Sequence, residues 1–269
     1  MNEPKVVLIT GASSGFGKVT ARLLAEQGYS VFGTSRRPSE AEPVPGVDML
    51  QLDVRSDESV AACLGSVLRK AGRLDVLVNN AGYIVAGAAE ETPIEAVRAE
   101  FETNLFGAHR MVLAALPAMR KQRSGKIINI SSVAGFASGP FLGFYSASKF
   151  AIEGYSEALR AEVRPFNIHV SLIEVGFSRT NIARNAQMPS RPISDYETCR
   201  ERAFGCMLRR VEHGADPRLV AERVLRIVES KAPCLRHRVG WEAIGIALGR
   251  WIARDSVFER VVRKYFELD

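Results

Sequence analysis

Near its N-terminus the chain reads Val6-Val7-Leu8-Ile9-Thr10-Gly11-Ala12-Ser13-Ser14-Gly15-Phe16-Gly17, and this stretch decides the fold. The apolar run has the length and branching of a buried strand, and the residues after it show helical spacing up to Gly28. Glycines between a strand and a helix allow a tight turn and a close approach to a pyrophosphate, which the helix N-terminus attracts. The spacing is G-x-x-x-G-x-G rather than G-x-G-x-x-G, so a plain tight turn stays an alternative. The candidate phosphate-binding residues are Gly11, Ser13, Ser14, Gly15, Phe16 and Gly17.

The rest of the chain alternates short apolar runs with helical patterns. We predict strands over 6–9, 30–35, 49–54, 76–79, 126–130 and 168–175, and helices over 56–71, 93–120, 144–165, 216–231 and 241–266. Such alternation predicts right-handed crossovers and a parallel sheet with helices on both faces. We therefore expect an α/β fold, a Rossmann-like doubly wound parallel sheet that forms a single domain over residues 1–269. Residues 176–215 show no regular pattern.

Composition excludes several classes of protein. Of 269 residues, 46% are hydrophobic and 25% are charged, which is ordinary for a soluble globular protein. The net charge is +6, but basic residues occur only in short clusters, so we expect no nucleic-acid partner. No apolar run reaches the roughly 18 residues of a membrane span or resembles a signal peptide, which predicts no integral membrane segment and a cytoplasmic protein. The four cysteines and four histidines are scattered, so no metal site is predicted.

The end of the second strand indicates which dinucleotide binds. An acid at this position usually holds the ribose 2′-hydroxyl of NAD, whereas a basic group accommodates the 2′-phosphate of NADP. Here the chain has Arg36 and Arg37 and no acid before Glu40, which favours NADP(H), with NAD(H) as the alternative. Asp53 could accept a hydrogen bond from the adenine amino group, or it could cap the following helix.

Catalytic chemistry is indicated by Tyr145-Ser-Ala-Ser-Lys149. Residues four apart share one face of a helix, so the Lys149 ammonium could lower the pKa of the Tyr145 phenol and make it a proton donor or base. Ser132 ends the fifth strand, where its hydroxyl could polarise a substrate oxygen. Asn104 is a poor helix former inside a long predicted helix, and its amide could hold a kink or a water that relays protons.

Taken together, these motifs resemble those of the compact branch of the short-chain dehydrogenase/reductase family over about residues 5–180. The resemblance rests on Thr10 to Gly17, Asp53, Asn79 to Gly82, Asn104, Ser132, and Tyr145 with Lys149. It implies an oxidoreductase that interconverts a ketone or aldehyde and an alcohol by hydride transfer. It also implies a homodimer or homotetramer, because family members commonly pair through two helices.

The resemblance also implies individual roles. Tyr145 is the acid/base, Lys149 tunes its pKa and binds ribose, Ser132 stabilises the substrate, and Asn104 takes part in the proton relay. Further cofactor contacts fall on Asn80, Ala81, Gly82, Gly176 and Thr180. One departure is Val175, because the family usually has proline before this glycine and a proline-free turn is less rigid.

Substrate selection is expected in residues 176–215 and 240–269. Their apolar side chains, with a tail similar to the hydroxysteroid- and retinol-dehydrogenase-like branch, favour a lipophilic small-molecule substrate. The tail could instead pack on a partner subunit or lie on a membrane surface. Two alternatives to this enzyme remain: a catalytically silent NADP-binding redox sensor, and an isomerase or dehydratase with a tightly held cofactor.

Overall fold

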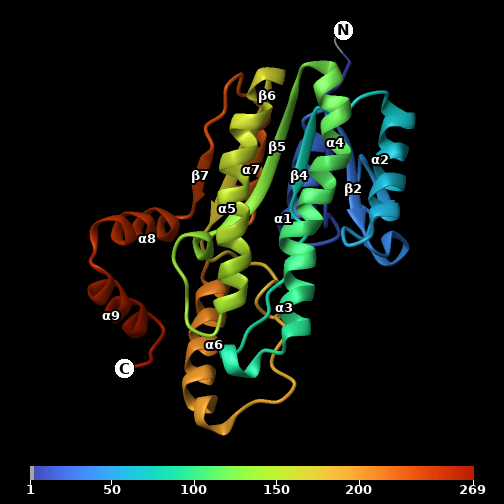
Figure 1. Cartoon of the computed structure of the whole chain (residues 1–269). Coiled ribbons are helices and arrows are strands. Elements are labelled where there is room, and N and C mark those ends of the chain that lie inside the picture. Colours follow the sequence, from blue (N-terminus) through green and yellow to red (C-terminus); the bar gives the residue numbers. More distant parts are fainter. Residues whose placement is uncertain (1–2) are drawn as a thin grey trace.

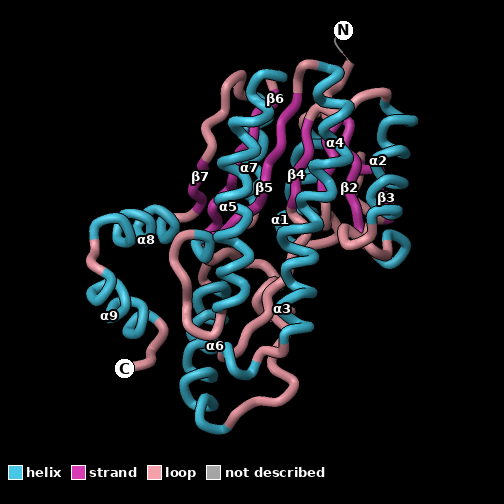
Figure 2. The backbone as a smooth tube through the Cα atoms, in the orientation of Figure 1, coloured by secondary structure: helices cyan, strands magenta, loops and turns pink. Residues whose placement is uncertain are grey.

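The central element is a seven-stranded, all-parallel sheet in the order β3-β2-β1-β4-β5-β6-β7 (Figure 2). The computed structural model describes residues 3–269. The strands are β1 (Val6–Ile9), β2 (Ser30–Ser35), β3 (Val47–Gln51), β4 (Val76–Asn79), β5 (Gly125–Ser132), β6 (Ile168–Val175) and β7 (Arg236–Val239). The predicted doubly wound α/β fold is confirmed.

Helices cover both faces of the sheet (Figure 1). They are α1 (Gly15–Glu26), α2 (Asp57–Ala71), α3 (Ile94–Phe101), α4 (Ala108–Gln122), α5 (Gly143–Val163), α6 (Glu197–Glu212), α7 (Arg218–Glu229), α8 (Trp241–Ile252) and α9 (Asp255–Tyr265). One core packs α2, α4 and α5 against the sheet, and a second core packs α1 and α7 on the opposite face. Alternate residues of β1 enter the two cores: Val6 and Leu8 enter the first, and Val7 and Ile9 enter the second.

The structure differs from the predicted elements in five places. The helix predicted over 93–120 is two helices joined by a π-helical segment, Glu102–Gly107, and Pro93 lies at the N-cap. The tail is two helices rather than one, residues 176–215 contain α6, and β7 was not predicted. β3 ends at Gln51, so Asp53 lies beyond the strand, and Ser56 rather than Asp53 caps α2 by accepting from the Ser59 N–H.

The sheet topology fixes where ligands can bind. β1 lies between β2 and β4, so the crossovers from its two sides diverge and leave a crevice beyond the carboxyl ends of the strands. Gly17 allows α1 to approach this edge, because a Cβ there would lie 2.3 Å from the Gly11 carbonyl oxygen. The glycine-rich turn, the end of β5 and the start of α5 therefore meet around one crevice.

Candidate active site

The crevice holds a cleft of about 580 Å³, here called the polar cleft. Its volume falls within the roughly 300–1,000 Å³ of small-molecule sites. The predicted site residues that line it are Gly11, Ser13, Ser14, Gly15, Phe16, Arg36, Asp53, Asn80, Ala81, Gly82, Ser132, Tyr145, Lys149 and Thr180. Three predicted cofactor residues, Gly17, Arg37 and Gly176, do not line it.

The glycine-rich turn has the shape of a phosphate cradle. Gly11 and Gly15 have φ angles of +67° and +53°, which side chains with a Cβ rarely adopt. Ser14 is the N-cap of α1, but its side chain makes no capping hydrogen bond, so the first N–H groups of the helix remain available. These groups, with the positive end of the helix dipole, fit a pyrophosphate.

Asn80 and Thr10 hold the turn in place. The Asn80 side chain donates to the carbonyl oxygens of Thr10 and Gly11 at 2.8 and 3.0 Å. The Thr10 hydroxyl in turn accepts from the N–H groups of Asn80 and Ala81, both at 2.9 Å. The ends of β1 and β4 are thus locked together where the cradle begins.

The two arginines after β2 differ in their surroundings. Arg36 lines the polar cleft. Arg37 is 75% exposed in its side chain and pairs with Glu40 at 3.2 Å. Beside Arg36, Arg55 binds Asp53 at 2.7 Å and holds the pKa of that carboxyl at about 2. This rim of the cleft therefore carries one cation, Arg36, that has no ion-pair partner in the described part of the chain.

Tyr145, Ser132 and Lys149 converge on the inner end of the cleft. Tyr145 is 8% exposed, and a hydrogen bond with Ser132 favours its phenolate. Burial outweighs this bond and raises the Tyr145 pKa to about 12, so the predicted lowering is wrong for the structure as it stands. Lys149 does not offset the effect of burial, because its Nζ donates to the Ile130 carbonyl at 2.9 Å and lies 5.8 Å from the Tyr145 ring centroid. Burial lowers the Lys149 pKa to about 8.

Asn104 lies in the π-helical segment, and its side chain makes three hydrogen bonds. The amide accepts from the Tyr83 N–H at 3.1 Å and donates to the Tyr83 carbonyl and the Ser148 hydroxyl at 3.0 and 3.1 Å. Ser148 also donates to the Tyr145 carbonyl. The side chain therefore clamps the segment after β4 to α5, which fits the predicted kink, and its oxygen keeps one free lone pair that could accept from a relay water.

Thr180 and Val175 complete the wall next to β6. The Thr180 hydroxyl is buried without a hydrogen-bond partner in the described residues, as expected of a group that a ligand amide would satisfy. Val175 replaces the usual proline and stays within β6, opposite Ser132 and Val239. The following Gly176 donates to the Val239 carbonyl at 3.1 Å, so the sheet fixes this turn.

A second hollow, here called the apolar cavity, has a volume of about 380 Å³. It runs from Ser132 and Tyr145 toward the C-terminal helices, and it shares these two residues and Ile182 with the polar cleft. Its walls include Gly176, Phe177, Met207 and Val211, and residues of α8 and α9. Ser132 and Tyr145 thus lie where a polar ligand site and an apolar ligand site meet.

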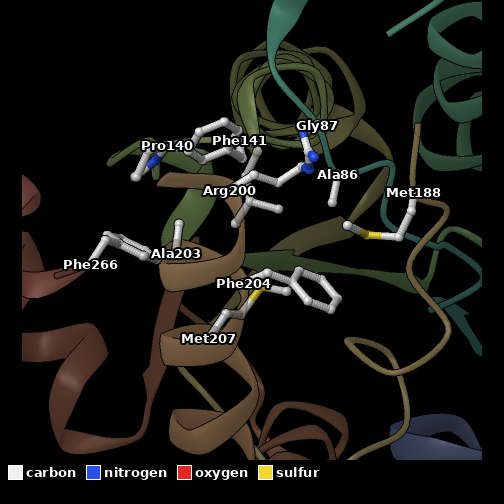
Figure 3. Close-up of a pocket in the computed structure, with 11 residues that line it drawn as sticks. Ala86, Gly87, Pro140, Phe141, Met188, Arg200, Ala203, Phe204, Met207 and Phe266 are labelled. Carbon is white, nitrogen blue, oxygen red and sulfur yellow. The ribbon is translucent and has the colours of Figure 1, made fainter. Parts of the chain in front are cut away.

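The lower wall of the substrate region is closely packed (Figure 3). A cavity of only about 10 Å³ remains in this wall. Its lining includes Ala203, Phe204 and Met207 of α6, together with Phe266, Pro140 and Phe141. Arg200 points toward Gly87 and forms a buried ion pair with Glu91. This pair ties α6 to the segment before α3, and Met207 and Val211 of α6 line the apolar cavity.

Comparison with known proteins identifies the family. The chain matches the family model described as short chain dehydrogenase over residues 5–190. It belongs to the short-chain dehydrogenase/reductase family. A 3-ketodihydrosphingosine reductase of Bacteroides thetaiotaomicron is 45% identical over 240 residues, 88% of each chain. The structure of a Streptomyces avermitilis short-chain dehydrogenase has a TM-score of 0.83 and 35% identity, covering 99% of this chain and 97% of that one. A Burkholderia cenocepacia short-chain dehydrogenase in complex with NADP has a TM-score of 0.77 and 28% identity, covering 96% and 97%.

The predicted family and enzyme class are therefore confirmed: this short-chain dehydrogenase is an oxidoreductase that acts on CH–OH groups. Neither the structure nor the comparisons favour a silent sensor. In the part of the chain that the structure describes, no helix is long and apolar enough to cross a bilayer.

Sequence reasoning missed one ionisable group of this dehydrogenase. Glu100 is fully buried in α3, and its carboxylate accepts from the Val85 N–H at 2.9 Å. Burial raises its pKa to about 7, while the charge of Lys149 acts in the opposite direction. Its position four residues before Asn104 places it on the same helical face, which was the available signal.

Proposed function

We propose that this dehydrogenase reduces a lipophilic ketone or aldehyde to the alcohol with NADPH. The observation that carries the proposal is the meeting of the polar cleft and the apolar cavity at Ser132 and Tyr145. A nicotinamide bound in the polar cleft would supply the hydride. The substrate carbonyl would lie at the junction, with the rest of the substrate among residues 176–215 and 240–269.

The protein's own groups would handle the substrate oxygen. The Ser132 hydroxyl would hydrogen-bond the carbonyl and polarise it. The raised pKa of Tyr145 keeps the phenol protonated at neutral pH, so it is ready to donate a proton as the carbonyl is reduced. The Lys149 ammonium, whose Nζ lies 5.8 Å from the Tyr145 ring centroid, would offset part of the charge on the phenolate that remains after the proton is donated.

Arg36 supports the choice of NADPH. It lines the cleft next to the ion-paired Asp53, and a guanidinium can bind a 2′-phosphate through two hydrogen bonds. Related structures contain NADP in one case and NAD in another. The Arg37 guanidinium pairs with Glu40 and lies outside the cleft, so we assign the phosphate contact to Arg36.

Paired variants test the cofactor assignment. We expect Arg36→Asp to lower kcat/KM for NADPH relative to NADH by about tenfold or more, since charge-assisted hydrogen bonds contribute about 1.5–3 kcal/mol. Arg37→Asp makes the same change of charge one residue away and should leave the ratio within about twofold. Equal effects of the two variants would contradict the assignment.

The reaction is tested by following NADPH absorbance with a panel of lipophilic ketones. The panel should include 3-ketodihydrosphingosine, the compound named for the Bacteroides relative. Tyr145→Phe should lower kcat by about a hundredfold or more, the range of general acid catalysis. Tyr155→Phe is the matched control. Tyr155 also lies on α5, and this substitution removes a hydroxyl that hydrogen-bonds His109 of α4. If wild type and Tyr145→Phe are equally inert while both bind NADPH, the silent-sensor alternative gains.

We also propose that the dehydrogenase is a homo-oligomer that pairs through α4 and α5. Phe106 at the end of the π-helical segment, Leu113 of α4 and Phe150 of α5 are about half exposed. Large exposed apolar side chains gathered on one face mark protein contacts. Sedimentation equilibrium of Leu113→Glu, which should dissociate the assembly, tests this proposal.

A further inference from the structure

A band of exposed apolar side chains runs along the last two helices. We call it the α8–α9 face, and it consists of Trp241, Ile244, Leu248, Trp251, Ile252, Val257 and Val261. Trp241 and Trp251 are 80% and 88% exposed, although tryptophan is usually largely buried. Figure 1 shows α8 and α9 standing away from the sheet on one side of the molecule. A continuous apolar surface of this kind marks an interaction site.

The opposite side of α8 serves the apolar cavity. Gly245, Ile246 and Gly249 line the cavity, as does part of the exposed Trp241, whereas Ile244, Leu248 and Trp251 do not line it and are exposed. Val261 of α9 both lines the cavity and is 56% exposed. The outer apolar face is therefore continuous with the wall of the cavity that ends at Ser132 and Tyr145.

Positive charge accompanies this face. Arg254, Arg260 and Lys264 are exposed and have no ion-pair partner among residues 3–269, against one such acid in α8 and α9, Glu259. Arg250 and Arg263 pair with Asp255 and Asp269. Arg260 and Lys264 follow Val257 at helical spacings of three and seven, so cations and valines share one side of α9. A partner that binds this face should offer an apolar layer for the tryptophans and valines and negative charge for the cations.

We propose that the α8–α9 face docks the dehydrogenase on the surface of an anionic lipid bilayer. α8 has 12 residues, too few to span the roughly 30 Å hydrocarbon core, but enough to lie in the interface with its apolar side down. Tryptophans near both ends of the helix suit the boundary between headgroups and chains. A second copy of the chain on this face would cover the cavity wall at Val261, whereas a bilayer would deliver a lipophilic substrate there.

The chain supplies its own reporter for this contact. Its two tryptophans both belong to α8, so intrinsic tryptophan fluorescence reports on this helix alone. The probes are vesicles of phosphatidylcholine and vesicles of equal parts phosphatidylcholine and phosphatidylglycerol. We expect a blue shift of emission with the anionic vesicles, much weaker with the neutral ones, and reduced by high salt. Co-sedimentation with the same vesicles gives the binding constant.

Variants away from the cavity test the contact surface. Leu248→Ser with Trp251→Ser should weaken binding to the anionic vesicles by about tenfold or more, because burying a leucine contributes about 1.5–3 kcal/mol. Arg260→Gln with Lys264→Gln should remove most of the preference for anionic vesicles. Leu219→Ser on α7, a leucine that is 45% exposed and lies outside the α8–α9 face, is the matched control and should bind normally.

Three results would overturn the proposal. They are the absence of a fluorescence shift with either vesicle, equal binding to both vesicles, and a blue shift that grows with protein concentration without lipid. The last result would assign the α8–α9 face to a second copy. Binding is measured without substrate or turnover, so its failure would leave the proposed reductase activity untouched.

Discussion

Glu100→Gln tests the charge state of the acid buried behind Asn104. Glu100 is 0% exposed, and one carboxylate oxygen accepts from the Val85 N–H while the other has no partner in the described residues. Glutamine keeps an oxygen for the Val85 N–H and cannot ionise. The substitution therefore removes the charge and leaves the shape nearly unchanged.

The expected size follows from the pKa. Burial raises the Glu100 pKa from 4.5 to about 7 in the folded protein. Between these pH values the folded state holds a proton that the unfolded chain has lost, so stability falls as pH rises. At about 1.4 kcal/mol per pKa unit, the loss amounts to roughly 3 kcal/mol, complete above about pH 7 and absent below about pH 4.5. The glutamine NH₂ group adds a roughly constant cost of about 1 kcal/mol for an unsatisfied donor.

Urea unfolding at fixed protein concentration, from about pH 5 to pH 8, measures this difference. The free energy of unfolding of Glu100→Gln relative to wild type should rise by about 2–3 kcal/mol across this range. Glu102→Gln is the control: its side chain is 41% exposed and pairs with Arg110, so its effect should be small and nearly independent of pH. A constant difference between Glu100→Gln and wild type at every pH would refute the reasoning.

Three further predictions concern other residues. The kcat for reduction should fall above about pH 8, where Lys149 loses the proton that stabilises the Tyr145 phenolate; a profile flat to about pH 10 would contradict this. Gly17→Ala places a Cβ 2.3 Å from the Gly11 carbonyl and should destabilise the protein by about 1–3 kcal/mol, visible as a lower Tm. Thr180→Val should raise the KM for NADPH by about three- to tenfold with an unchanged Tm, because its hydroxyl has no partner within the described chain, whereas Thr180→Ser should behave as wild type.

Local sequence signals predicted most of the fold. The bounds of β1, β2, β4 and β6 match the apolar runs, and Ser56 caps α2 as its residue type indicates. β7 was missed because Arg236 and Arg238 give it a polar pattern. Those arginines pair with Glu174, and Arg236 also with Glu153, so contacts with β6 and α5 make the strand. Such partners lie 62 to 83 residues away in the sequence, and no local pattern contains them.

For the candidate site, too, the sequence predicted part of what the structure shows. The sequence predicted which groups gather at the crevice, because strand ends and helix starts place Ser132, Tyr145 and Lys149 together. It did not predict their protonation states, because burial depends on the whole fold. The Lys149 ammonium donates to the Ile130 carbonyl rather than to the phenol, and the buried Glu100 carboxylate accepts from the Val85 N–H, 15 residues before it in the chain. A motif therefore identifies the reacting groups. Which of them carries a proton depends on their burial, and segments distant in the sequence determine that burial.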